Sequence, residues 1–270
     1  MSNRTKRLKL KPQSYCIFCI SSGLSKEHFW SEWIGDLIKI PAPQGAVEAR
    51  WTHRPNSPFP ILESRRFRQG STLSKKIRCV CERCNNEWMS EIESECKDVM
   101  TPLILGSKTT LDESNQLLVA TWVTLKLFIA ESGEGRQVIS TQKERTAFMN
   151  ERILPQGLQI FIGQCGRDGW EATFWRGADT IGTPWQKPRP PAPNIQCIAI
   201  GTGHLFIYAL QCKAAIPFNI DPGERLFRIY PAQQTTLNWP PPKRLSSAEA
   251  GLLADTLGRF SAMPGVLRVP

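Results

Sequence analysis

The sequence lacks any run of apolar residues long enough to cross a membrane as a helix, which takes about 20 of them. Its longest apolar stretch, residues 116–130, contains Gln116 and Lys126. The first residues are basic and have no apolar segment behind them, which is not the pattern of a secretory signal. We therefore expect no membrane partner and a cytoplasmic location.

Acidic residues are scarce relative to basic ones. The chain has 34 lysines and arginines against 24 aspartates and glutamates, which gives a formal charge of +10. The excess lies in residues 1–78, where 15 basic residues accompany 5 acidic ones. A basic segment beside a nearly neutral remainder favours binding to a polyanion, and nucleic acid is the commonest one in a cytoplasm. A basic surface that serves solubility alone is the alternative.

The residue patterns predict an α+β protein in four segments. Residues 1–13 form a basic tail, residues 14–100 a module rich in cysteine and tryptophan, residues 101–155 a helical segment, and residues 156–270 a mostly antiparallel sheet with a closing helix. Helices are predicted over 29–38, 85–100, 111–131, 142–152 and 248–259, and strands over 157–164, 170–175, 195–200, 204–211 and 225–230. The proline-rich stretch 41–78 has no sustained periodicity and is predicted to be an irregular basic insertion.

Helix starts are predicted from capping residues. Asn85 or Asn86 is expected to cap the helix at 85–100. Three capping boxes, Thr110 to Glu113, Thr141 to Glu144 and Ser246 to Glu249, are expected to open the next three helices.

Two Cys-x-x-Cys pairs dominate the first module, Cys16 with Cys19 and Cys81 with Cys84. Each pair places two thiolates on one tight turn, and two pairs complete the tetrahedral shell of a structural Zn²⁺ ion. Two independent redox or core pairs are the alternative, but no thioredoxin-like βαβ pattern surrounds either pair. Cys79 is a spare thiol that would chelate less well with Cys81. The other four cysteines, at 96, 165, 197 and 212, are predicted to be core thiols.

Histidine is rare, with three in the chain, and one of them follows an acid in a suggestive place. Glu27 and His28 come shortly after the first cysteine pair, and Asn85 comes directly after the second. The series Cys-x-x-Cys, Glu-His, Cys-x-x-Cys-Asn resembles the zinc-stapled branch of the HNH, or ββα-metal, endonucleases over about residues 14–95. In that family a β-hairpin and one helix hold a catalytic divalent ion.

The resemblance implies a role for each matching residue. His28 would be the general base, Glu27 and Asn85 would bind a catalytic Mg²⁺ or Mn²⁺ ion, and the four paired cysteines would hold zinc. Phosphodiester hydrolysis calls for the same residue types, because an imidazole can take a proton from water near neutral pH and hard oxygen ligands suit Mg²⁺. The family's middle asparagine has no match here, and Ser74 and Asn86 are the candidates to replace it.

Basic side chains of the insertion are the predicted contacts to phosphates, because arginine forks suit phosphate and interleaved aromatic rings can stack on bases. They are Arg65, Arg66, Arg68, Lys75, Lys76 and Arg78. The predicted function is therefore a metal-dependent DNA endonuclease, with RNA left open as a substrate, in phage defence or restriction. A homodimer or a companion defence protein is the expected partner. The alternatives are a non-catalytic zinc-finger nucleic-acid-binding protein and an interaction module of a defence complex.

Overall fold

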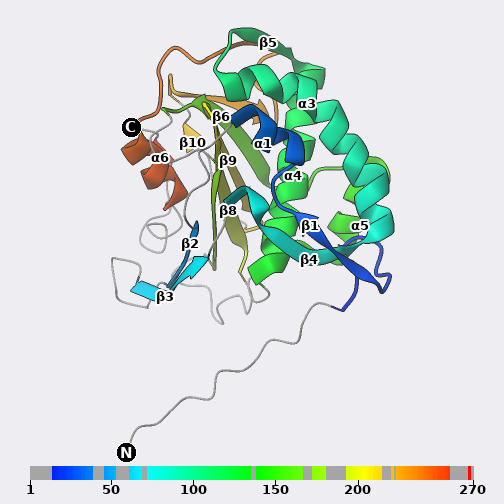
Figure 1. The fold of residues 1–270 in the computed structure, drawn as a ribbon. Helices are drawn as coiled ribbons and strands as arrows, with labels where there is room; N and C mark the ends of the chain where they lie inside the picture. Colours follow the sequence, from blue (N-terminus) through cyan, green and yellow to red (C-terminus); the bar gives the residue numbers. More distant parts are fainter. Residues whose placement is uncertain are drawn as a thin grey trace, which may run out of the picture.

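The computed structural model describes residues 14–38, 46–52, 61–68, 72–134, 138–166, 172–180, 193–214, 220–221, 223–255 and 267–268, without the side chains of 46–52, 61–68, 134 and 267–268. A mixed α+β arrangement is seen, with a central antiparallel sheet between helices (Figure 1). The predicted basic tail, 1–13, lies outside the described residues. No helix among the described residues is long and apolar enough to span a membrane.

The central sheet has five strands in the order β11-β6-β9-β8-β7, and every neighbouring pair is antiparallel. The strands are β6 (Leu158–Gln164), β7 (Thr173–Asp179), β8 (Ile195–Thr202), β9 (Leu205–Cys212) and β11 (Leu226–Tyr230). The period-two prediction is confirmed for all five, with shifted ends. Gly203 makes the tight turn between β8 and β9 at φ +58°, and a Cβ there would lie 2.4 Å from the Ile104 carbonyl oxygen, so only glycine fits.

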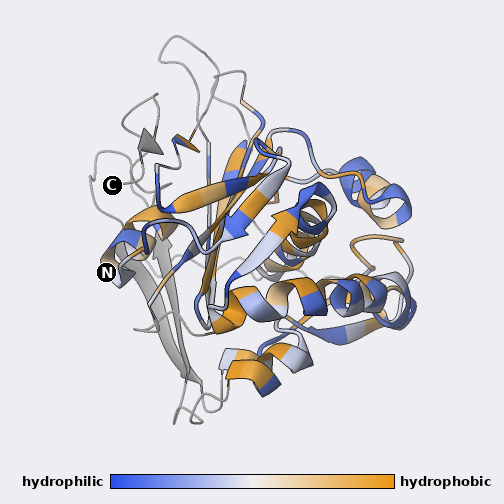
Figure 2. Ribbon diagram, turned by 90° about the horizontal axis from the view of Figure 1, so that it is seen from above, coloured by the Kyte–Doolittle hydropathy of each residue, from blue (hydrophilic) through white to orange (hydrophobic). Residues whose placement is uncertain are grey.

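Helices cover both faces of this sheet. Helix α4 (Glu113–Glu134) packs on one face, and α6 (Ser247–Ala254) packs on the other. Residues 118–131 of α4 are buried or half-buried on all sides. The sequence predicted Leu117 as part of its apolar face, but Leu117 is 49% exposed. In Figure 2 apolar residues fill the interior between sheet and helices.

The first module contains a two-stranded hairpin followed by a helix. Strand β1 (Leu24–His28) pairs antiparallel with β4 (Lys76–Cys81), and a short helix, α1 (Glu32–Ile38), follows β1. The chain then continues from β4 through α2 (Glu82–Cys84), the π-helical turn η2 (Asn85–Met89) and α3 (Ser90–Leu105). The helix starts earlier than predicted, because the Cys81 sulfur accepts the Cys84 amide and caps it. The prediction that Asn85 or Asn86 is the cap is therefore wrong.

The insertion is more regular than its sequence indicates. Strands β2 (Ala46–Thr52) and β3 (Ile61–Arg68) form an antiparallel pair, a 3-10 turn, η1 (Thr72–Ser74), follows, and residues 76–78 already belong to β4. The prediction of an irregular segment is wrong for these residues, because pairing between two short strands left no periodicity strong enough to read. His53 lies outside the described residues.

Two further strands change the start of α4. Strand β5 (Thr109–Asp112) pairs with β12 (Thr236–Trp239), far along the chain. The expected capping box at Thr110 does not form, because that residue is in a strand. Instead the Asp112 carboxylate accepts the Asn115 amide at 2.8 Å and caps the helix.

The other two capping boxes are confirmed, at α5 (Gln142–Glu151) and at α6. A last pair, parallel, joins β10 (Ile220–Asp221) to β13 (Leu267–Arg268).

One hydrophobic core joins the cysteine-rich module to the rest of the chain. A single cluster of buried residues extends from Cys16 to Trp239 and passes through α3, α4 and the sheet. Phe29, just after β1, stacks on Phe174 of β7 with ring centroids 4.0 Å apart. The segment boundaries expected at residues 100 and 155 therefore do not separate hydrophobic cores.

Candidate metal centre and hairpin site

The two Cys-x-x-Cys pairs meet in one place. The sulfur atoms of Cys16, Cys19, Cys81 and Cys84 all lie within 4.8 Å of one another. The first pair precedes β1 and the second joins β4 to α2, so the pairing of these strands brings the four thiols together. All nine cysteines of the chain are free, as a thiolate site requires. The donor set and its closeness fit a structural Zn²⁺ ion.

Backbone hydrogen bonds shape the first cysteine turn. The Ile20 amide donates to the Cys16 carbonyl at 3.0 Å, and the Cys16 amide donates to the Ser21 carbonyl at 2.8 Å. Ile20 closes this turn in the left-handed region, at φ +60°, where a β-branched residue is strained. Cys79 is fully buried beside the turn and is not part of the four-sulfur cluster, as its spacing predicted.

The thiols of the cluster differ in acidity. Burial acts to raise the pKa of Cys19, but hydrogen bonds from Ser21 outweigh it and lower this pKa to about 6. Burial raises the pKa of Cys16 and of Cys84. One thiolate is thus available near neutral pH, and a bound zinc ion would favour loss of the other protons.

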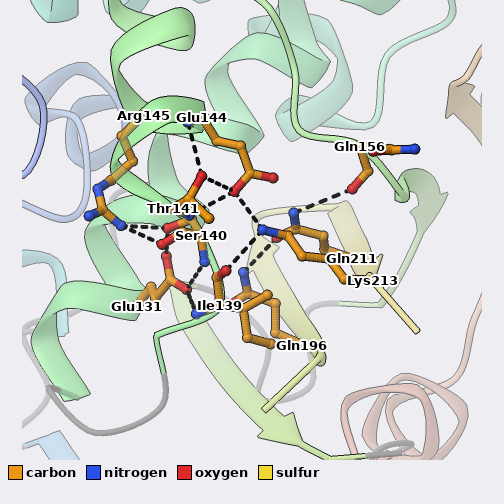
Figure 3. Close-up of polar contacts among 10 residues, drawn as sticks. All are labelled: Glu131, Ile139, Ser140, Thr141, Glu144, Arg145, Gln156, Gln196, Gln211 and Lys213. Atoms are coloured by element: carbon orange, nitrogen blue, oxygen red, sulfur yellow. Dashed lines mark hydrogen bonds and ion pairs between the residues drawn. The ribbon is translucent and has the colours of Figure 1, made fainter. Parts of the chain in front are cut away.

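The first cysteine turn is also held by side chains from α5. Arg145 donates from Nε to the Ile17 carbonyl, and Gln142 donates from Nε2 to the Phe18 carbonyl, both at 2.9 Å. Figure 3 shows Arg145 within a polar network around Ser140, to which Glu131 and the capping residue Glu144 belong. The Phe18 ring is fully buried among aromatic rings of three helices. The centroids of Trp88, Phe128 and Phe148 lie 4.8, 6.0 and 6.5 Å from it.

Glu27 and Asn85 come together at the inner face of the hairpin. Glu27 is 9% exposed, and the Asn85 side chain, one residue after the second cysteine pair, lies close enough to favour its charged form. Burial raises the pKa of Glu27 to about 7, and the nearby Glu93 carboxylate adds to the rise, while the Lys126 ammonium and Asn85 oppose it. The two residues that the sequence pattern paired therefore lie near each other, and their role as ligands of a divalent ion stays a prediction.

His28 is the next residue of β1 and lies on the other face. It is directly opposite Lys76 in the strand pairing, whereas Glu27 is opposite Ile77, and successive residues of a strand point to opposite sides. The His28 side chain is 32% exposed, with its Nδ1 atom 3.9 Å from a Glu32 carboxylate oxygen. The imidazole is thus reachable from solvent.

The predicted phosphate contacts are distributed over two strands. Arg65, Arg66 and Arg68 are on β3, where the structure describes only the backbone. Lys75 precedes β4, and its ammonium lies 4.5 Å above the Phe174 ring. On β4 itself, Lys76 is exposed beside His28.

Arg78 is also exposed on β4, and it donates from Nε to the Leu24 carbonyl at 3.1 Å. The two lysines and Arg78 therefore lie on or beside the hairpin strand that faces β1.

Sequence reasoning missed a buried ion pair under the hairpin. Lys126 of α4 has no exposed surface, and its Nζ atom lies 2.5 Å from a Glu93 carboxylate oxygen on α3. The signal was present in the sequence, because a lysine inside an apolar helix must be paired when it is buried. Lys126 interrupts the apolar stretch of residues 116–130, but the sequence does not identify the acid that pairs with it.

Among the described residues, the four cysteines are the one group of three or more cysteine, histidine and acidic side chains close enough to share a metal ion. No family model, no curated protein and no solved structure matches the chain. What the site can do is therefore inferred from its own residues.

Proposed function

We propose that the chain is a metal-dependent endonuclease of the HNH kind that hydrolyses phosphodiester bonds of DNA. The observation that carries the proposal is the interaction through which the Asn85 side chain acts to lower the pKa of the buried Glu27 carboxyl. It joins the inner face of a hairpin strand to the helix that follows the second cysteine pair, beside a four-cysteine cluster. This is the arrangement that the HNH resemblance implies.

The oxygen atoms of Glu27 and Asn85 suit a hard divalent cation such as Mg²⁺ or Mn²⁺. The raised pKa of Glu27 supports this role, because a buried carboxyl with too little compensating charge is stabilised as a carboxylate by a cation beside it. When bound, such an ion supplies positive charge to the phosphate under attack. Two protein ligands leave room around it for water and for the substrate.

His28 takes the proton from the attacking water in this proposal, since imidazole titrates near neutral pH and this one is accessible to solvent. Lys76 lies opposite it on the same side of the hairpin and can contact a phosphate oxygen. Lys75 and Arg78, on or beside the same strand, can contact further phosphates of the DNA backbone. Each phosphate contact adds to the salt dependence of binding.

The four cysteines have a structural role in the proposal. A zinc ion held by them ties the start of β1 to the end of β4 and the first turn of the helix. Glu27 and Asn85 are carried by those same elements, so the staple preserves their spacing. We place the enzyme in phage defence or restriction, acting as a homodimer or with a companion protein.

A second function is favoured by one observation. His28 lies on the face of β1 opposite to Glu27, so the base and the metal-binding pair do not point to the same side. A non-catalytic zinc-finger protein that binds nucleic acid would need no such convergence. Binding without cleavage is therefore the competing outcome of the experiment below.

The test is cleavage of supercoiled plasmid by the wild type, His28→Ala and a matched control, His204→Ala, whose histidine lies in the β8–β9 turn. Reactions contain Mg²⁺, Mn²⁺ or EDTA, and zinc content is measured for every protein. We expect cleavage that requires Mg²⁺ or Mn²⁺ and is lost in His28→Ala alone, with equal zinc in all three. Salt-sensitive DNA binding without cleavage by any of them would contradict the nuclease and support the binding protein.

A further inference from the structure

A buried lysine lies beneath the hairpin. Lys126 is in the middle of α4, with none of its surface exposed, and its ammonium group also lies 5.3 Å from the centre of the Trp122 ring. Removing an ammonium group from water costs several kcal/mol unless it is well paired. The contact of 2.5 Å to Glu93 supplies the opposite charge.

The Glu93 carboxylate connects three separate parts of the chain. One oxygen contacts Lys126 of α4, and the other accepts hydrogen bonds from the Trp122 indole nitrogen, at 3.0 Å, and from the Ser31 hydroxyl. We call these four residues, Ser31, Glu93, Trp122 and Lys126, the Glu93 clamp. Burial acts to raise the pKa of Glu93, but Lys126 and these hydrogen bonds outweigh it and lower the pKa.

The clamp lies between the two segments that carry the proposed site. Ser31 comes three residues after His28, in the connection from β1 to α1. Glu93 is in the first turn of α3, eight residues after Asn85 and beyond a backbone kink at Glu87 in η2. Glu27 experiences the charges of both Lys126 and Glu93. A single carboxylate therefore links the end of β1, the helix of Asn85 and the central helix α4.

We infer that the Glu93 clamp is a positioning device, which holds the Glu27–His28 end of β1 in register with Asn85. Its catalytic consequence rests on the proposed nuclease function, whereas its structural consequence does not. Without the clamp, the connection after β1 would lose its hydrogen-bonded link to α3. Small displacements of reacting groups are costly, since a shift of about 1 Å can reduce a rate roughly 100-fold.

The experiment compares three clamp variants of graded severity: Ser31→Ala, Glu93→Gln and the double variant Glu93→Gln with Lys126→Met. Ser31→Ala removes only one hydroxyl, so it keeps the test informative if the others fold poorly. The matched control is Glu224→Gln with Lys243→Met, which removes another Lys–Glu pair with a 2.5 Å contact, both of whose residues lie outside the cysteine-rich module. The zinc content of each sample measures its amount of folded protein, and the kinetic constants are normalised to it.

Two measurements are made on each variant. The first is hydrogen exchange of the Phe29 amide, which donates to the Lys75 carbonyl at 2.9 Å just beyond His28, with the Cys16 amide as internal reference. The second is kcat and KM for plasmid cleavage per zinc-loaded molecule. We expect Phe29 exchange to accelerate about tenfold and kcat to fall 10- to 100-fold in Glu93→Gln. The KM for DNA, the Cys16 amide and the control variant should not change.

Each outcome of these two measurements either supports or overturns the positioning role of the Glu93 clamp. Unchanged Phe29 exchange in all three clamp variants would overturn the inference, whether or not the protein cleaves DNA. Faster exchange with an unchanged kcat would leave the clamp a purely structural feature and overturn its positioning role. If the wild type does not cleave DNA but Phe29 exchange still accelerates, the proposed nuclease function fails and the link between β1 and α3 stands.

Discussion

Replacing Phe18 by alanine tests whether the first cysteine turn folds with the rest of the protein. Phe18 lies between Cys16 and Cys19 and is fully buried against Trp88, Phe128 and Phe148. Truncating a buried phenylalanine to alanine costs about 3–5 kcal/mol. The loss of three aromatic contacts places Phe18→Ala in the upper part of this range. For a chain of this size that corresponds to a fall in Tm of roughly 7–9 °C.

The measurement is thermal unfolding in saturating zinc, followed both by far-UV circular dichroism and by tryptophan fluorescence. Both signals should shift together in Phe18→Ala, because Phe128 and Phe148 belong to helices outside the cysteine-rich module. Tyr15→Ala is the control, since Tyr15 is 56% exposed and its loss should cost less than about 0.5 kcal/mol. A separate early transition with the main Tm unchanged would refute the reasoning and show that the turn folds independently.

Two further changes have outcomes that the structure fixes in sign. Ile20→Gly should raise the free energy of unfolding of the zinc-loaded protein, measured in urea, by roughly 0.5–1 kcal/mol. Glycine accepts the φ of +60° without the roughly 1–2 kcal/mol strain of a side chain. A lower free energy of unfolding would contradict the strain at this position. Burial acts to raise the pKa of Glu144, but its bonds to Lys213 and Thr141 outweigh burial and lower this pKa overall. The ionised carboxylate therefore stabilises the fold above the unfolded-state pKa of about 4.5, and this stabilisation is lost as the pH falls. Glu144→Gln should therefore be less stable at pH 7, with a gap to the wild type that narrows below pH 4.5 in equilibrium unfolding; a gap independent of pH would show that the charge has no part in it.

Local patterns predicted much of this fold. The five strands of the central sheet are short apolar segments separated by turn residues, which is enough to find them, and two of three capping boxes form as expected. The third failed because Thr110 pairs with Asn238, 128 residues away. No local signal reports such a pairing. Strands β2 and β3 are neighbours in sequence, and they were missed because their proline-rich stretch has no sustained periodicity.

The metal centre was more predictable than its surroundings. Ligand spacing within each cysteine pair is a local property, so Cys16, Cys19, Cys81 and Cys84 could be grouped from the sequence alone. The contact of Glu27 with Asn85 followed from a family pattern rather than from physics. The Glu93–Lys126 pair could not be assigned from the sequence. A lysine inside an apolar helix indicates that a buried partner is required, but the sequence does not show which acid is that partner.

The distance along the chain between the two cysteine pairs has a consequence for biosynthesis. A ribosome releases the chain from its N-terminus, so 61 residues are made between Cys19 and Cys81. The four-sulfur site cannot close in that interval, and Phe18 lacks its aromatic partners until Trp88, α4 and α5 follow. The nascent chain therefore exposes one half of a metal site and an unpaired strand, β1, for the time it takes to make roughly half of the protein. Zinc supply and chaperone protection should matter most during this interval.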